Sequence, residues 1–137
     1  YAGYVASLAF DNWEILGAEH SGVASQLRSL CSKDVMICLS LMPYATETMR
    51  RARLGIAAGA QIIAITDNST SPIASQAHEL ILVATENQHF FASQLGVLYV
   101  LEAIIGLMVA KSDDTIQSNL QKSELFSRNN GDYHTWN

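Results

Sequence analysis

Three short apolar runs mark the middle of the chain: Val35–Leu39, Ile62–Thr66 and Leu80–Ala84. Their length and their β-branched residues predict strands. The apolar pattern within each run is continuous rather than alternating, which is typical of strands that are covered on both faces of a sheet. The sequence therefore predicts a buried sheet built from at least these three segments.

Stretches with a helical period of apolar residues lie between and around these runs. Ser71-Pro72 has the form of a helix cap followed by proline at the first helical position, and Gly59 is a natural stop after a helix. Ala18–Ser21 is a candidate for a poor edge strand, and residues 129–137 have the composition of a loose tail. The predicted helices span Tyr1–Leu16, Gly22–Cys31, Thr46–Ala58, residues 72 to about 78, Asn87–Lys111 and Asp113–Phe126.

Strands that alternate with helices at this spacing predict βαβ units and a parallel sheet. Ligands of such sheets bind outside the carboxyl ends of the strands, where helix N-termini point. Small hydroxyl residues fall at that edge: Ser40 ends the first run, and Thr66 with the following Ser69, Thr70 and Ser71 ends the second. The same edge is therefore the predicted place for a binding site.

Serine and threonine hydroxyls suit phosphate oxygens, and the N–H groups of a helix N-terminus attract anions. Thr46 and Thr48 open the helix that follows Ser40, which completes a candidate phosphate cradle. No glycine-rich nucleotide loop occurs in the chain, so a nucleotide site has no sequence support. The alternative, that these hydroxyls are ordinary helix and strand caps, stays open on the residues alone.

Composition narrows the class further. The 137 residues are 49% hydrophobic with a net charge of −5, so we expect a globular chain. Its basic cluster is formed by Arg50, Arg51 and Arg53. This cluster fits a solvated helix face better than a nucleic-acid footprint. Gln94 and Glu102 interrupt the one membrane-like stretch, 90–110. Two cysteines form no disulfide framework, and no basic leader opens the chain, so we expect a cytoplasmic protein. We expect neither a metal nor another cofactor.

The run from Asp34 to Ser93 resembles the SIS (sugar isomerase) domain, in the form found in RpiR-type bacterial transcriptional regulators. It contains a strand that ends in serine, then Pro-Tyr-x-x-Glu-Thr at 43–48, Gly-Ala-x-x-Ile-Ala-Ile-Thr-Asp at 59–67, Ser-Pro-Ile-Ala at 71–74 and Phe-Phe-x-Ser at 90–93. The resemblance extends over about residues 1–110.

This resemblance implies a flavodoxin-like, three-layer α/β domain with a doubly wound parallel sheet, which occupies residues 1–128, binds a phosphorylated sugar and forms a homodimer or higher homo-oligomer. DNA would be bound by an N-terminal helix-turn-helix domain that the sequence does not contain. The family's first strand, with its G-x-G-x-S loop, has no counterpart either, and Met42-Pro43 replaces the Ser-Gly of many members. The residues implied to contact the phosphosugar are Ser40, Tyr44, Thr46, Thr48, Thr66, Ser69, Glu86 and Ser93.

Three functions are consistent with the sequence. The first is a non-catalytic sensor of a sugar phosphate that also dimerises. The second is a sugar-phosphate isomerase in which Glu86, close in sequence to His89, acts as general base. The third is a mainly structural dimerisation module, because the predicted helix Asn87–Lys111 is apolar almost all round and needs cover on most sides.

Overall fold

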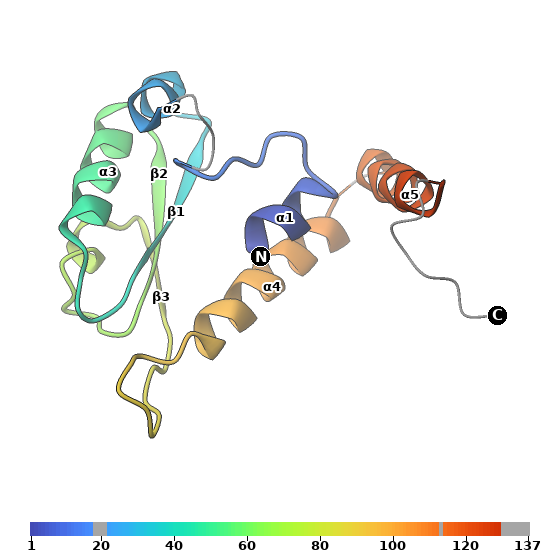
Figure 1. Cartoon of the computed structure of the whole chain (residues 1–137). Helices are drawn as coiled ribbons and strands as arrows, with labels where there is room; N and C mark the ends of the chain where they lie inside the picture. The colour runs from blue at the N-terminus through green and yellow to red at the C-terminus, as the bar shows by residue number, and fades with distance from the viewer. Residues whose placement is uncertain (18–21, 113, 130–137) are drawn as a thin grey trace. The chain divides into compact units, whose positions relative to one another are not determined.

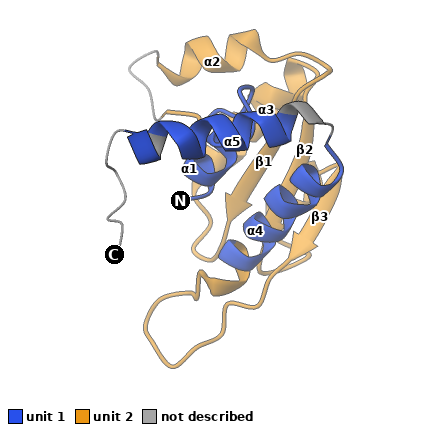
Figure 2. Cartoon of the chain, turned by 90° about the vertical axis from the view of Figure 1, so that its right-hand side faces the viewer, with its two compact units in different colours: residues 1–15, 98–137 blue, residues 16–97 orange. Residues whose placement is uncertain are grey.

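The structure is a computed structural model that describes residues 1–17, 22–112 and 114–129. The chain divides into two compact units (Figure 2). Leu16–Val97 form the first, which we call the sheet unit, and Tyr1–Ile15 with Leu98–Asn137 form the second, which we call the helical unit. The predicted edge strand Ala18–Ser21 lies outside the described residues.

The sheet unit is built on three parallel strands in the order β1-β2-β3 (Figure 1). They are β1 (Val35–Ser40), β2 (Gln61–Thr66) and β3 (Glu79–Leu82). This confirms the predicted α/β class and all three strands. Ser40 is the register partner of Thr66, and Thr66 of Leu82, so the strands end together at one edge. Within the described residues β1 pairs with β2 alone.

Helices α2 (Val23–Ser29) and α3 (Thr46–Ala57) complete the core of this unit. Buried side chains of β1 and β2 pack against Met49 and Ala52 of α3 and Leu27 of α2. Cys38 belongs to this core, and burial raises the pKa of its thiol to about 11, which confirms its predicted role as a small core residue. The core members on the strands are Met36, Cys38, Ile62 and Ala64.

Gly55 lets α3 approach the sheet closely. A Cβ atom at this position would overlap the Met36 sulfur, and Ile62 Cδ1 would lie 3.6 Å away. In most helices alanine is about 1 kcal/mol more favourable than glycine, but forcing extra atoms into a packed core costs about 1–3 kcal/mol.

We therefore expect Gly55→Ala to lower the free energy of unfolding by about 1 kcal/mol, against the usual trend. In a Met36→Ala background, where the overlapping sulfur is absent, the same change should be neutral or stabilising. Urea unfolding of the wild type, Gly55→Ala, Met36→Ala and the double variant measures the change in the free energy of unfolding in both backgrounds. A stabilising Gly55→Ala in the wild-type background would show that the close approach does not matter.

The helical unit contains α1 (Ala2–Ser7), most of α4 (Leu95–Ala110) and α5 (Asp114–Asn129). Its core combines Ala6, Ala9 and Phe10 with Ile105 of α4, and Ile116 and Leu120 of α5 pack against it. The predicted helix Tyr1–Leu16 is too long, because α1 ends at Ser7. Asp11 and Asn12, which favour turns over helix interiors, lie in the turn that follows.

The predicted helix from residue 72 to about His78 is also wrong: only a 3₁₀ turn, Ala74–Gln76, forms. His78 explains why the helix stops. Its backbone N–H donates to the Ile62 carbonyl at 2.9 Å, and its Nδ1 accepts a hydrogen bond from the Ile62 N–H at 2.9 Å. These bonds require an extended chain at Ala77, so the sheet overrides the local cap signal.

Helix α4 begins at Leu95, eight residues later than the predicted start at Asn87. The Asn87 side chain closes a loop here: its Nδ2 donates to the Phe91 carbonyl at 2.8 Å, and its Oδ1 accepts from the His89 N–H at 2.6 Å. The Ser93 N–H donates to the Thr85 carbonyl at 2.9 Å, which holds the loop's two ends together. Side-chain bonds to backbone thus replace the first turns of the helix.

Candidate functional site

Ser40 and Thr66 lie side by side at the carboxyl edge of the sheet, as predicted. Both are buried, with 4% and 0% of their surface exposed. Thr66 donates from its hydroxyl to Asp67 at 3.3 Å. The Ser40 hydroxyl, in contrast, has no hydrogen-bond partner among the described residues, although its oxygen is inaccessible to solvent. A buried hydroxyl without a partner is costly, and such groups are concentrated at functional sites.

Asp67 organises this edge, although the sequence prediction did not include it. One of its carboxylate oxygens accepts from Thr66, and the other accepts from the Met42 N–H at 3.3 Å. The Tyr44 hydroxyl also bonds to Asp67; loss of solvation and this bond together raise the pKa of Tyr44. Asp67 thereby ties the loop between β1 and α3 to the end of β2.

Thr46 and Thr48 stand in the first turn of α3, as predicted. The N-cap residue is Ala45, and no side chain caps the helix. The Thr48 N–H donates a hydrogen bond to the Ala45 carbonyl at 3.1 Å. The alternative that these threonines serve as helix caps therefore fails for α3. Its amino end keeps backbone donors and a positive dipole end that favour an anion.

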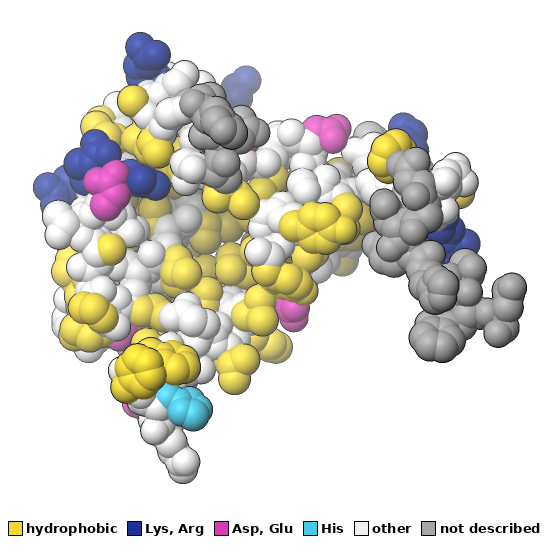
Figure 3. Space-filling model, viewed as in Figure 1, with side chains coloured by type: hydrophobic (Ala, Val, Ile, Leu, Met, Phe, Trp, Pro, Cys, Tyr) yellow, Lys and Arg dark blue, Asp and Glu magenta, His cyan; other side chains and the backbone are white. Residues whose placement is uncertain are grey.

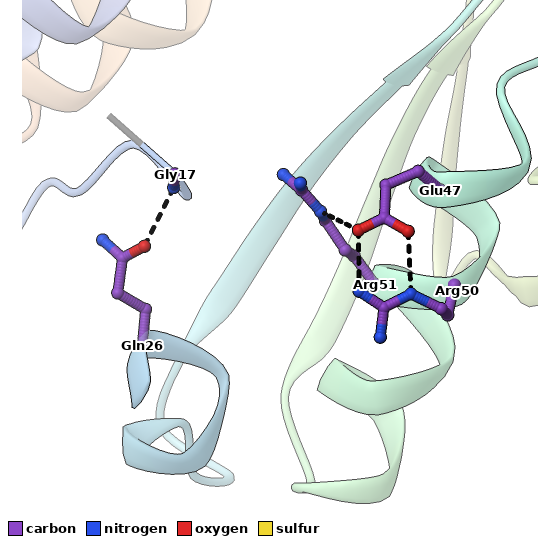
Figure 4. A network of polar contacts seen from close by, with 5 residues as sticks. All are labelled: Gly17, Gln26, Glu47, Arg50 and Arg51. Atoms are coloured by element: carbon purple, nitrogen blue, oxygen red, sulfur yellow. Dashed lines mark hydrogen bonds and ion pairs between the residues drawn. The ribbon is translucent and has the colours of Figure 1, made fainter. Parts of the chain in front are cut away.

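Glu47 in the same turn is engaged by two arginines (Figure 4). Arg50 binds both of its carboxylate oxygens at 2.7 Å, and Arg51 Nε donates to one of them at 2.9 Å. These bonds lower the pKa of Glu47 from 4.5 to about 2.

Figure 4 also shows the Gly17 N–H donating to Gln26, at 2.9 Å, which ties the start of the sheet unit to α2.

This pKa gives a test in acid. A carboxyl whose pKa falls on folding contributes stability above its unfolded pKa near 4.5, and the contribution is lost as the pH falls toward about 2. We expect the free energy of unfolding of the wild type to fall more steeply across that window than that of Glu47→Gln. Urea unfolding at several pH values measures the slopes, with Glu14→Gln as the exposed-carboxylate control. Equal slopes for wild type and Glu47→Gln would contradict the assignment.

The second hydroxyl cluster forms a tight turn after β2. Asn68 Oδ1 accepts from the Thr70 N–H at 2.9 Å and from the Thr70 hydroxyl at 2.8 Å. Ser69 is exposed on this turn, whereas Ser71 is buried at 3% exposure with an unpartnered hydroxyl in the described structure. Ser71 was not among the predicted site residues, because its place before Pro72 looked like a cap.

Glu86 and Ser93 belong to the loop after β3. Glu86 is exposed, and within the described residues no ion pair reaches it. The His89 ring stacks on Phe91 with centroids 5.5 Å apart. The Ser93 hydroxyl accepts from the Leu95 N–H at 3.4 Å, just before the start of α4. The pairing of Glu86 with His89 that a general base would need is not formed here.

A hollow of about 570 Å³ opens between the loop after β1 and the loop after β3. Two of its lining residues, Leu39 and Leu41, are the sequence neighbours of Ser40, and the lining is mainly apolar. Its lining residues are Leu39, Leu41, Met42, Pro43, Phe90, Phe91, Ala92 and Gln94. No group of three or more metal-binding side chains occurs in the part of the chain that the structure describes. Over the same residues, every helix falls short of the length and apolar character needed to cross a membrane.

The fold and this edge define an α/β domain that can present hydroxyl and helix-end donors to an anion. Residues 15–108 match the model of the SIS domain family, which is more than half of the chain. The chain therefore belongs to the SIS domain family, and the recognition made from residues 34–93 is confirmed. Among curated proteins, none matches the sequence.

Solved structures share the fold. The sugar isomerase domain of an RpiR transcription factor from Sphaerobacter thermophilus aligns with a TM-score of 0.67 and 23% identity, over 74% of this chain and 56% of that one. The Vibrio vulnificus NanR protein complexed with ManNAc-6P gives 0.74 and 16%, over 93% and 49%. A putative phosphosugar isomerase from Bacillus subtilis gives 0.54 and 19%, over 93% and 42%. The chain thus spans about half the length of these relatives.

Proposed function

We propose that this chain is the sugar-phosphate-sensing and dimerisation domain of a bacterial transcriptional regulator and has no catalytic activity of its own. One observation carries the proposal: the buried Ser40 hydroxyl lacks a partner in the described structure and stands at the sheet edge that precedes α3, whose amino end no side chain caps. The likeness to an RpiR transcription factor and to NanR, which was solved with ManNAc-6P, supports the ligand class.

In this proposal, residues 1–128 form the sensing domain in a cytoplasmic protein, and DNA is bound by a helix-turn-helix domain elsewhere in a longer chain. Ser40, Thr46 and Thr48 hold the phosphate. Residues around them line the rim and contact the sugar. These are Tyr44, Thr66 and Ser69 at the rim, and Glu86 and Ser93 on the sugar side.

Isothermal titration calorimetry tests the proposal with N-acetylmannosamine 6-phosphate, glucose 6-phosphate, fructose 6-phosphate and the matching unphosphorylated sugars. We expect heat of binding from at least one phosphorylated sugar and none from its unphosphorylated partner. Inorganic phosphate serves to separate a bare anion site from a sugar site. Absence of binding to every sugar phosphate would overturn the proposal.

A sugar-phosphate isomerase is the second candidate, favoured by the likeness to the putative phosphosugar isomerase and by the exposed Glu86 beyond the carboxyl edge of the sheet. Isomerisation requires a base that removes the proton next to the sugar carbonyl. NMR in D₂O detects exchange of that proton for solvent deuterium. Exchange that disappears in Glu86→Gln would favour the enzyme, and absence of exchange with every sugar phosphate that binds would leave the sensor.

A further inference from the structure

The hollow of about 570 Å³ between the loop after β1 and the loop after β3 lies wholly within the sheet unit. Its volume is in the range of small-molecule pockets, which is about 300–1,000 Å³. Seven of its eight described lining residues are apolar, and none of the eight is charged. Such a lining suits the apolar portion of a ligand.

The aromatic wall of the hollow is exposed but held in place. Phe90 and Phe91 are 100% and 55% exposed, and their rings meet edge to face with centroids 5.2 Å apart. Hydrogen bonds of the Asn87 side chain with the Phe91 carbonyl and the His89 N–H fix the backbone that carries these rings. In Figure 3 hydrophobic side chains gather next to a histidine where this loop lies in Figure 1. An exposed apolar patch of this kind marks a surface that binds a ligand or a partner.

The hollow begins beside the candidate phosphate site. Leu39 and Leu41, two of its lining residues, flank Ser40 in the sequence. Successive side chains of a strand point to opposite faces, so Leu39 lies on the face of the sheet that Ser40 does not face. A ligand whose phosphate is held at Ser40 therefore reaches the hollow when its sugar crosses the carboxyl end of β1. The hollow is thus a place for a substituent of the sugar and not for the phosphate.

A sugar hydroxyl would find few partners in this hollow. Among the described lining residues, Gln94 has the one side chain that carries an amide, and the Met42 N–H already donates to Asp67 at 3.3 Å. Burying a hydroxyl without a partner is costly, whereas burying a methyl group is favourable. The Gln94 amide donates to the Ala92 carbonyl over a long 3.4 Å, so it remains available to a second amide. These groups fit a substituent that consists of one amide and an apolar end.

We infer that the ligand is a sugar phosphate with an acylamino group, whose acyl chain lies in the hollow against Met42 and Phe91 and whose amide faces Gln94. The inference rests on the proposed function and adds the substrate class to it. Met42 and Phe91 then determine specificity, because they distinguish an N-acyl amino sugar from the parent hexose while the phosphate is held elsewhere.

Isothermal titration calorimetry with matched ligands tests the class. N-acetylglucosamine 6-phosphate is compared with glucose 6-phosphate and with glucosamine 6-phosphate, which has the nitrogen but no acyl group. The same three ligands are compared in the manno series. In one of the two series the acetylated ligand should bind at least about tenfold more tightly than both others, which is the usual effect of an added apolar group in an apolar pocket. A hexose or free amine that binds as tightly as the acetylated ligand in both series would overturn the inference.

Phe91→Ser tests the wall of the hollow. It should lower the affinity for the acetylated ligand about three- to tenfold and leave the affinity for the parent hexose phosphate unchanged, because only the acyl chain contacts this side chain. Met42→Ser should act in the same way. Phe126→Ser and Met108→Ser make the same changes at positions of the helical unit that are 69% and 39% exposed, and they should keep the wild-type affinities. An unchanged preference in both hollow variants, or an equal loss in the controls, would contradict the assignment of the wall.

Saturation-transfer NMR on the wild type gives an answer that does not depend on how a variant folds. Saturation of the protein should reach the acetyl methyl protons more strongly than the protons of the sugar ring, and the reverse order would count against the inference. Binding of sugar phosphates without preference for the acetylated ligand would overturn this inference and leave the proposed function. Absence of binding by every sugar phosphate would overturn both.

Discussion

Replacing Ile62 by alanine is expected to lower the free energy of unfolding by about 2–5 kcal/mol. Ile62 lies in the central strand β2 with none of its surface exposed, and it belongs to the core that joins the sheet to α2 and α3. Truncation removes buried methyl groups and leaves a cavity in the core, beside Gly55 and Met36.

Urea unfolding followed by circular dichroism measures this loss, with Ile56→Ala as the matched control. Ile56 is on α3 and 38% exposed, so the same chemical change there should cost much less, about 1 kcal/mol or below. Equal losses in the two variants would mean that the β2 face is not the core of the sheet unit. A reduced denaturant slope in Ile62→Ala alone would mean that the two units unfold separately.

The strands could be predicted because their physical cause is local in the sequence. A continuous run such as Val35–Leu39 predicts a strand, and the run is followed by a helix long enough for a parallel crossover. The expected cover on both faces is not seen among the described residues, because Val35 and Leu39 are 54% and 40% exposed. Parallel strands end at one edge, so the sequence also predicted that Ser40 lies next to Thr66. The pattern of apolar runs that end in hydroxyl residues therefore predicted at which edge of the sheet the candidate site lies.

The predictions for two helices were wrong because of contacts between residues that lie far apart in the sequence, or because of side chains that bind backbone. The 3₁₀ turn is short because His78 must bond to Ile62, 16 residues earlier. The late start of α4 comes from Asn87, whose amide satisfies the loop backbone in place of a helical turn. No periodicity in the sequence records either bond, so a helix was predicted where only a 3₁₀ turn forms, and α4 was predicted to begin too early.

Asp67 was missed for a related reason. Its position after β2 was visible, but its bonds to the Met42 N–H and the Tyr44 hydroxyl depend on how the loop after β1 folds back. The consequence for the site is electrostatic. A carboxylate already uses the donors of Thr66 and Met42, so an incoming phosphate depends more heavily on groups that Asp67 does not engage.

Ser40 is the buried member of that remaining group, and Ser40→Ala should separate stability from binding. Removing a buried hydroxyl that has no partner among the described residues should raise the free energy of unfolding, by about 1 kcal/mol, because unsatisfied groups cost about 1–3 kcal/mol. The same change should weaken sugar-phosphate binding about 10- to 100-fold, because a hydrogen bond to a charged group contributes about 1.5–3 kcal/mol.

Urea unfolding and calorimetry on the same preparation measure the two effects of Ser40→Ala. The control is Ser75→Ala, which removes an exposed hydroxyl that donates to the Pro72 carbonyl at 3.1 Å, away from the carboxyl edge. It should lose a few tenths of a kcal/mol of stability at most and keep the wild-type affinity. If Ser40→Ala gains stability without losing affinity, the hydroxyl is a defect of the core and not a ligand donor. A loss of both would instead show that the Ser40 hydroxyl is satisfied in the folded protein, because only then does its removal destabilise the sheet edge.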